Sequence, residues 1–315
     1  MGWWIGLWDR REAALSMALA RILLALVVLW DLLDVVRLGL VVPLWGPAEV
    51  GGMGNPAARL EPPLLYTWFP QTAETAQWAV YVAILLACCL LVGVGTRLVA
   101  LALMLLLAQL ALVLPAADRG IDMLLRNALL ILGLSGCGGA LSFDAWRRAG
   151  SWLGGGRLVP SWPRYLLVVQ MTVLYFTAGV QKVSTQWLPI GGFSALYIAM
   201  RDPAFAVGEL AWLDAVYPLT QAATAATLVW EWCAPLILLN FHFRDRSVPR
   251  PGRVRRVVGH RLFLPVWLAI GAGFHLGTAA TLRLGIFPFA CLSLYPCFFH
   301  PTAIASAARR VLRRA

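Results

Sequence analysis

The chain has 315 residues, of which 60% are hydrophobic and 13% are charged, and its mean hydropathy is +0.75. A soluble globular domain has about half apolar and about a quarter charged residues, so this composition excludes an ordinary soluble domain and predicts a protein in contact with a lipid bilayer. The formal net charge is +11. Its basic residues stand mostly in short loops between apolar runs, as the positive-inside rule expects, so no nucleic-acid partner is predicted.

Eight apolar runs follow one another, each with roughly the length that crosses a bilayer. We predict an all-α fold, a polytopic membrane helical bundle, with one transmembrane domain over residues 1–315. Short interfacial helices are expected at Trp3 and Trp4 and between residues 183 and 217. The predicted spans are residues 13–40, 76–93, 98–114, 123–143, 165–182, 218–240, 262–282 and 284–299.

Loop charge predicts the orientation of the spans. Arginines gather in the loops at residues 147–164 and 244–261 and in the tail at 309–314, and with eight spans all of these fall on one side. The positive-inside rule makes this side cytoplasmic, together with both termini. A high content of Arg and Ala with a single Lys is typical of a GC-rich bacterial source. The predicted location is therefore the bacterial inner membrane.

Ionisable residues inside spans are costly in lipid, so they are expected to face the bundle interior and to pair. Arg21 lies about 12 Å from the cytoplasmic end of the first span, and Glu231 lies about 20 Å from the outer end of the sixth. Because the hydrocarbon core is about 30 Å thick, about 20 Å from the outer end is about 10 Å from the cytoplasmic end. The two residues therefore lie at similar depths, which predicts an ion pair that fixes helix packing. Asp31 and Asp34 share a helix face near the outer end of the first span. Asp34 is at a depth that suits a pair with Arg126.

Lys182 is the one lysine among 26 Lys and Arg residues. Lysine can lose its proton when it is desolvated and arginine cannot, so this position suits a base. Tyr175, Ala178 and Gly179 lie on the same face of the fifth span, where the small residues leave room for another helix or a ligand. Tyr175, and His275 in the seventh span, are further catalytic candidates. The alternatives are a lysine that anchors the helix end at the membrane surface and a histidine that is satisfied in the interior.

The six cysteines lie in or beside apolar runs, and none forms a C-x-x-C motif. We interpret them as small buried hydrophobic residues. Cys291, Cys297 and His300 do not have the spacing of a common metal site, so no metal is predicted.

The segment Y-F-T-A-G-V-Q-K from Tyr175 to Lys182, followed by Trp187 and Gly191, resembles a Y-F-x-A-G-x-x-K…W…G stretch of the vitamin K-dependent γ-glutamyl carboxylases. It is also similar to the wider HTTM (horizontally transferred transmembrane) family, which includes sporulation-delaying protein B-like proteins. Further segments agree in order and distance: G-V-G-T-R at residues 93–97, S-F-D at 142–144, F-H at 274–275 and G-I-F-P at 285–288.

The resemblance implies an enzyme in which Lys182 is the base that acts on a quinone or vitamin K-like hydroquinone, with carboxylase-like, lyase or oxidoreductase chemistry. Two features depart from the carboxylases. Their histidine near the outer start of the fourth span has no counterpart in M-L-L-R-N at residues 123–127, and their large luminal domain has none after the eighth run. Full glutamyl carboxylation by this chain alone is therefore not expected, which leaves a related redox or quinone reaction, or a partnered role in peptide or toxin maturation.

Two other functions fit the same residues. A non-catalytic membrane partner in peptide or toxin maturation, export or immunity would bind a partner protein or peptide and use Lys182 as an anchor. A small transporter would use the buried charges, although the sequence has no convincing inverted repeat.

Overall fold

The structure is a computed structural model that describes residues 9–54, 63–208, 212–245 and 252–312. The interfacial helix predicted at Trp3 and Trp4 lies outside these residues. The chain divides into two compact units, Met1–Leu167 with Ser293–Ala315 and Val168–Leu292. The single transmembrane domain over residues 1–315 stays a prediction.

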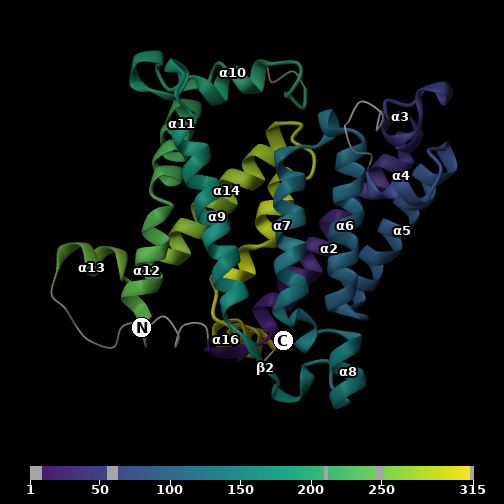
Figure 1. Ribbon diagram of the computed structural model, residues 1–315. Coiled ribbons are helices and arrows are strands. Elements are labelled where there is room, and N and C mark those ends of the chain that lie inside the picture. The colour runs from purple at the N-terminus through teal and green to yellow at the C-terminus, as the bar shows by residue number, and fades with distance from the viewer. Residues whose placement is uncertain (1–8, 55–62, 209–211, 246–251, 313–315) are drawn as a thin grey trace. The chain divides into compact units, whose positions relative to one another are not determined.

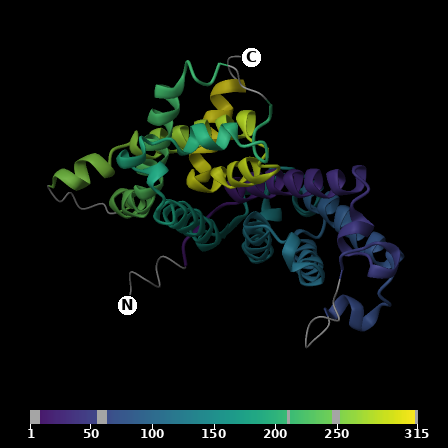
Figure 2. The same cartoon turned by 90° about the horizontal axis from the view of Figure 1, so that it is seen from above.

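Unit 1 is built on four long helices, α2 (Leu15–Arg37), α5 (Ala73–Val92), α6 (Thr96–Val113) and α7 (Gly120–Ser135). α5 packs between α2 and α6, and α7 packs on the other side of α6 (Figure 1). In Figure 2, α6 and α7 are seen nearly end-on, while α2, in purple, runs across the view. α2 and α5 both carry small side chains that are fully buried and allow close helix packing: Ala18, Ala20 and Ala25 in α2, and Ala76, Ala83 and Ala87 in α5.

A short antiparallel ribbon departs from the all-α prediction. β1 (Arg11–Ala13) pairs with β2 (Leu158–Pro160). Arg164, at the start of α9 (Trp162–Val180), donates to both carboxylate oxygens of Glu12 in β1, at 2.6 and 2.9 Å. Both side chains are buried, so this ion pair fixes the ribbon to the helix. The smaller helices of unit 1 are α3 (Val41–Trp45), α4 (Leu64–Trp68), α8 (Phe143–Ala149) and α16 (Pro301–Leu312).

Unit 2 holds the rest of α9 and the helices that surround it. α10 (Ala195–Arg201) packs on α11 (Tyr217–Trp232) and lies across its end (Figure 1). A helix was predicted between residues 183 and 217, and α10 confirms it. The other helices are α12 (Pro235–Asp245), α13 (Arg253–Val258), α14 (Phe263–Thr281) and α15 (Phe287–Ser293).

Three predicted spans end or bend at glycine or proline. The run predicted at 123–143 stops at Ser135, because Gly136 has a φ of 72° in the left-handed region that glycine favours at helix ends. The run predicted at 218–240 is two helices, α11 and α12, bent by 53°. Pro235 has no backbone N–H to continue the first of them. The run predicted at 284–299 is α15 followed by a 3-10 turn that begins at Tyr295, with Pro296 in it.

Within the described residues, three helices are long and apolar enough to cross a bilayer, α5, α6 and α14, and the bent pair α11–α12 makes a fourth if it counts as one span. Their outer faces carry large apolar side chains that are exposed in the isolated chain, for example Leu85, Leu98 and Val266. Such faces suit lipid rather than water. These helices indicate an integral membrane protein. The count of eight spans and the cytoplasmic side of the termini stay predictions.

Candidate functional site

Lys182 lies just beyond the end of α9 and pairs with Glu231 of α11. Its Nζ is 2.7 Å from both Oε1 and Oε2 of Glu231 and 3.4 Å from the carbonyl oxygen of Ala178. The side chain of Lys182 is 18% exposed and that of Glu231 is 3% exposed. The indole ring of Trp187 covers the ammonium, with its centroid 4.9 Å from Nζ. The amine is therefore held inside unit 2, against a carboxylate and an aromatic ring.

This pair replaces the one predicted between Arg21 and Glu231. The carboxylate of Glu231 is bound by Lys182, and Arg21 finds its partners within unit 1. Its guanidinium is fully buried and donates to the backbone oxygens of Leu90, at 3.1 Å, and Leu141, at 2.5 Å. Similar depth in the membrane did not decide the pairing, because depth leaves the rotation of each helix about its axis open.

Gly179 sets the close approach of α9 to α11. A Cβ at this position would lie 2.8 Å from Cδ1 of Trp232 and 2.9 Å from Cβ of Glu231, which is too close for either atom to stay in place. The small residues were predicted to leave room for another helix or a ligand, and in the structure a helix, α11, packs against Gly179. The close approach brings the side chain of Glu231 within reach of Lys182, which follows Gly179 by almost one helical turn.

Tyr175 and His275 form a second buried pair. Oη of Tyr175 lies 2.8 Å from Nε2 of His275, and both side chains are almost fully buried. The rings of Trp230 and Trp267 pack against Tyr175, with centroids at 4.5 and 5.5 Å. Each of these indoles donates to the backbone oxygen of the other, at 2.9 and 3.2 Å. This reciprocal bonding locks α11 to α14 and holds the Tyr175–His275 pair in place.

The two pairs lie along the same side of α9. Tyr175 and Lys182 are seven residues apart, or about 10 Å along a helix axis. Trp230, which packs on Tyr175, is the neighbour of Glu231 in α11. We call the four residues the acid–base column: Tyr175, Lys182, Glu231 and His275. The column brings together all three residues predicted to be catalytic and adds Glu231, which was predicted only as a structural charge.

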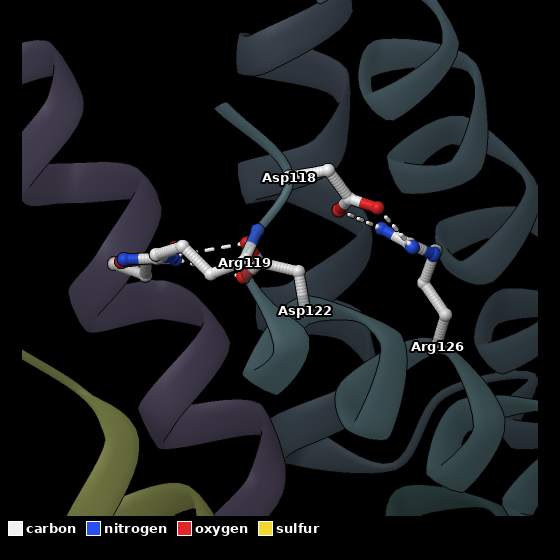
Figure 3. A network of polar contacts seen from close by, with 5 residues as sticks. Asp118, Arg119, Asp122 and Arg126 are labelled. Carbon is white, nitrogen blue, oxygen red and sulfur yellow. Dashed lines mark hydrogen bonds and ion pairs between the residues drawn. The ribbon is translucent and has the colours of Figure 1, made fainter. Parts of the chain in front are cut away.

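Unit 1 contains a separate ionic cluster at the start of α7. Nη2 of Arg119 lies 2.6 Å from Asp31 of α2 and 2.7 Å from Asp122 (Figure 3). Arg126 donates to both oxygens of Asp118, at 2.6 and 2.7 Å. Hydrogen bonding to Asp122 is the main cause that raises the pKa of Arg119 above its ordinary value. The cluster therefore stays ionic.

The predicted Asp34–Arg126 pair is wrong. Arg126 is bound by Asp118, and Asp34 makes an exposed ion pair with Arg37, one helical turn away in α2. The cluster borders a cavity of about 270 Å³ in unit 1, whose remaining lining is mostly apolar. Sequence reasoning had singled out Asp31 but missed its partner Arg119 and the second carboxylate, Asp122. Their signal was the i, i+3 spacing of Arg119 and Asp122 at a helix start, where an acidic side chain caps the backbone.

The comparisons with known proteins agree with the predicted family. A family model described as HTTM domain matches residues 10–242, which is well over half of the chain. The matched part includes Lys182 and Glu231 and ends before His275. No solved structure matches the chain. The predicted membership is thus confirmed, and this chain belongs to the HTTM family.

Proposed function

We propose that this HTTM-family protein is a membrane enzyme in which Lys182 acts as a base toward a lipid-soluble hydroquinone. The Lys182–Glu231 pair carries the proposal. The single lysine of the chain, in a sequence where every other cationic side chain apart from histidine is arginine, is held with both carboxylate oxygens at 2.7 Å in mostly buried surroundings. A purely structural ion pair would be served as well by arginine, which binds a carboxylate through two nitrogens.

Lys182 can accept a proton only when its amine is neutral. In apolar surroundings, transfer of a proton from the ammonium to the carboxylate removes two charges that are costly to bury. At 2.7 Å, that transfer needs no intervening water. Glu231 is then the group that holds the proton while Lys182 acts. An arginine at the same place would bind the carboxylate and keep its own proton.

A planar aromatic diol would be held at Lys182 by two neighbouring side chains. Trp187 offers an indole face for a ring, and Nζ of Lys182 can meet a hydroxyl group, so these two residues would hold the molecule. When bound, a hydroquinone supplies the acidic hydroxyl and the oxidisable ring. The Tyr175–His275 pair supplies a second buried site at which a proton can be held, shared between Oη and Nε2.

The resemblance to vitamin K-dependent carboxylases supports the same role for Lys182. The proposal stops short of glutamyl carboxylation, because residues 123–127 lack the carboxylase histidine and Arg126 at this place is bound to Asp118. The proposed reaction class is base-dependent oxidation of a hydroquinone by molecular oxygen, in which the hydroquinone gives up two electrons and two protons to become the quinone and the oxygen is reduced to hydrogen peroxide.

The test uses the full chain in lipid nanodiscs with menaquinol, a reduced naphthoquinone, in air. The measurement is the loss of menaquinol by chromatography, above the rate in empty nanodiscs. Lys182→Arg is expected to lower this rate at least about 100-fold, since a positioned base contributes about that much, and to keep the ion pair. Arg201→Lys, an exposed conservative change in the same unit, should keep the full rate. Equal rates for wild type and Lys182→Arg, or no turnover by the wild type, would favour the non-catalytic partner.

We also propose that the chain crosses a bacterial inner membrane eight times with both termini in the cytoplasm. The arginine-rich loops support this orientation. Reporter fusions after Gly150 and after Phe205 test it. The first should report the cytoplasm and the second the periplasm, and the same location for both would contradict the proposed topology.

A further inference from the structure

A basic hollow lies beside the turn between α5 and α6 of unit 1. It has a volume of about 560 Å³, and its lining includes four arginines from three segments: Arg97 at the start of α6, Arg147 and Arg148 in α8, and Arg157 before β2. Four glycines also line the hollow and contribute no side chains to it. We call it the arginine basin.

One carboxylate, Asp144, shares the basin with the four arginines, so three positive charges are in excess. Asp144 is already committed to the turn. It accepts from the backbone N–H of Gly95 at 2.9 Å and from the backbone N–H and hydroxyl of Thr96 at 3.0 and 3.2 Å. Partial burial raises the pKa of Asp144, but the hydrogen bonds outweigh it and hold that pKa below its ordinary value. Among the described residues, no ion pair joins any of the four arginines to a carboxylate.

A fifth arginine adds positive charge beneath the turn. Arg21 is fully buried, and a Cβ on Gly93 would collide with its Nη1 and with Ser142. In the part of the chain that the structure describes, Arg21 is bound by backbone oxygens and by no carboxylate, and its Nε has no hydrogen-bond partner. The carboxylate of Asp144 acts on this charge through space, but Asp144 shares the basin with four other arginines and forms no ion pair with Arg21. Fixed charges of one sign around a concave surface raise the local concentration of the opposite ion.

The position of the basin along the helices points to a lipid. The turn joins α5 and α6, which both have the length and hydropathy of membrane spans, so the turn lies near the level of the lipid headgroups. Trp146 and Trp152 stack on each other nearby, with centroids 6.4 Å apart, and both are exposed, as is Leu153. Tryptophan is enriched where hydrocarbon meets water.

We propose that the arginine basin binds the phosphate group of an anionic phospholipid. Guanidinium groups bind phosphate through two parallel hydrogen bonds, and the basin offers four that have no carboxylate partner. A soluble phosphate would explain the arginines, but it would leave the exposed Trp146, Trp152 and Leu153 beside them without a role. A lipid uses both, because its headgroup enters the basin while its chains lie against the apolar side chains. This site is distinct from the acid–base column and does not depend on the proposed reaction.

The test measures binding of phosphatidylglycerol to the purified full chain in detergent by native mass spectrometry. The variant is Arg147→Gln with Arg148→Gln, and its matched control is Arg309→Gln with Arg310→Gln, an equal charge change in α16. Each basic residue near an anionic lipid contributes enough to change affinity about fivefold, so the basin variant, which lacks two, should bind about 25-fold more weakly. The control should bind within about threefold of the wild type. Arg157→Gln, from another segment, should weaken binding about fivefold.

Phosphatidylcholine and inorganic phosphate are the comparison ligands, and they show whether the basin prefers an anionic lipid to a zwitterionic lipid or to free phosphate. The wild type should bind phosphatidylglycerol more tightly than either. An equal loss in the basin variant and its control would overturn the proposal, because charge alone would explain it. So would equal affinity for phosphatidylcholine, or inorganic phosphate that binds as tightly as the lipid.

Discussion

Lys182 and Glu231, which are 49 positions apart in the sequence, form an ion pair in which Nζ is equally close to both carboxylate oxygens. The pair exists because Gly179 lets α9 approach α11. This contact is compatible with two roles of Lys182, a catalytic base and one half of a structural ion pair. The two roles differ in which substitutions the protein tolerates, and in whether stability and activity change together.

Gly179→Ala is expected to destabilise the protein and to separate the ion pair. The new methyl group overlaps Trp232 and Glu231, which costs about 1–3 kcal/mol and exceeds the gain of about 1 kcal/mol in helix propensity. Thermal unfolding of the purified protein measures the difference. Gly273→Ala is the matched control, because a Cβ at that helical position meets nothing within 4 Å. A control that melts lower than Gly179→Ala would show that the close approach is not as tight as described.

A single and a double variant distinguish the role of Lys182 as a counter-ion from its role as a base. Lys182→Met leaves the carboxylate of Glu231, 3% exposed, without a counter-ion, at a cost of about 3 kcal/mol. Adding Glu231→Gln removes that charge, so the double variant should be more stable than Lys182→Met alone. It should also fail to turn over menaquinol if Lys182 is the base. Denaturant or thermal unfolding and the menaquinol assay give the two readouts. A double variant less stable than Lys182→Met would contradict the pairing.

Much of the helical layout follows from apolar run length, because about 20 apolar residues are needed to cross a bilayer. α5, α6 and α14 begin and end close to the predicted limits. The bend between α11 and α12 was missed, because the apolar run continues across Pro235 and hydropathy does not register a lost backbone N–H. The ribbon of β1 and β2 was also missed. Its strands are three residues each and lie far apart in the sequence, so no local pattern marks them.

The candidate site was predictable where one helix carries the residues and less so where two helices meet. The helical period placed Tyr175 and Lys182 on one side of the fifth span, and in the structure Tyr175 lies in α9 while Lys182 lies just beyond its end. The partner of Glu231 was wrongly predicted, because side-chain reach and helix rotation decide contacts between helices. The G-V-G-T-R and S-F-D segments were singled out by resemblance alone. Their physical reason is local, since Asp144 of one closes the turn that contains Thr96 of the other.

Tyr175→Phe tests the second pair of the column. The change removes the hydroxyl that binds His275 and keeps the ring that packs on Trp230 and Trp267. A buried polar partner that loses its hydrogen bond costs about 1–3 kcal/mol, so the unfolding temperature should fall. Val173→Ala, an exposed position on the same helix, should change it by less. Equal effects of the two variants would mean that the bond contributes nothing to stability.

Asp144→Asn tests whether the turn between α5 and α6 depends on an ionised carboxylate. The folded state holds the pKa of Asp144 below its ordinary value, so its stabilising effect is fully present above the unfolded pKa and is lost as the pH falls through the folded one. Hydrogen bonds to a charged group contribute about 1.5–3 kcal/mol, so Asp144→Asn should lower stability by about that amount at pH 7. The difference from wild type should begin to shrink below about pH 4, where the unfolded carboxyl becomes protonated, and should shrink further as the pH falls through the lower pKa of the folded state. Thermal unfolding from pH 7 to pH 3 measures it, with Glu49→Gln as an exposed control that shows no comparable trend. A difference that stays constant over this range would mean that the turn is closed by the shape of the side chain rather than by its charge.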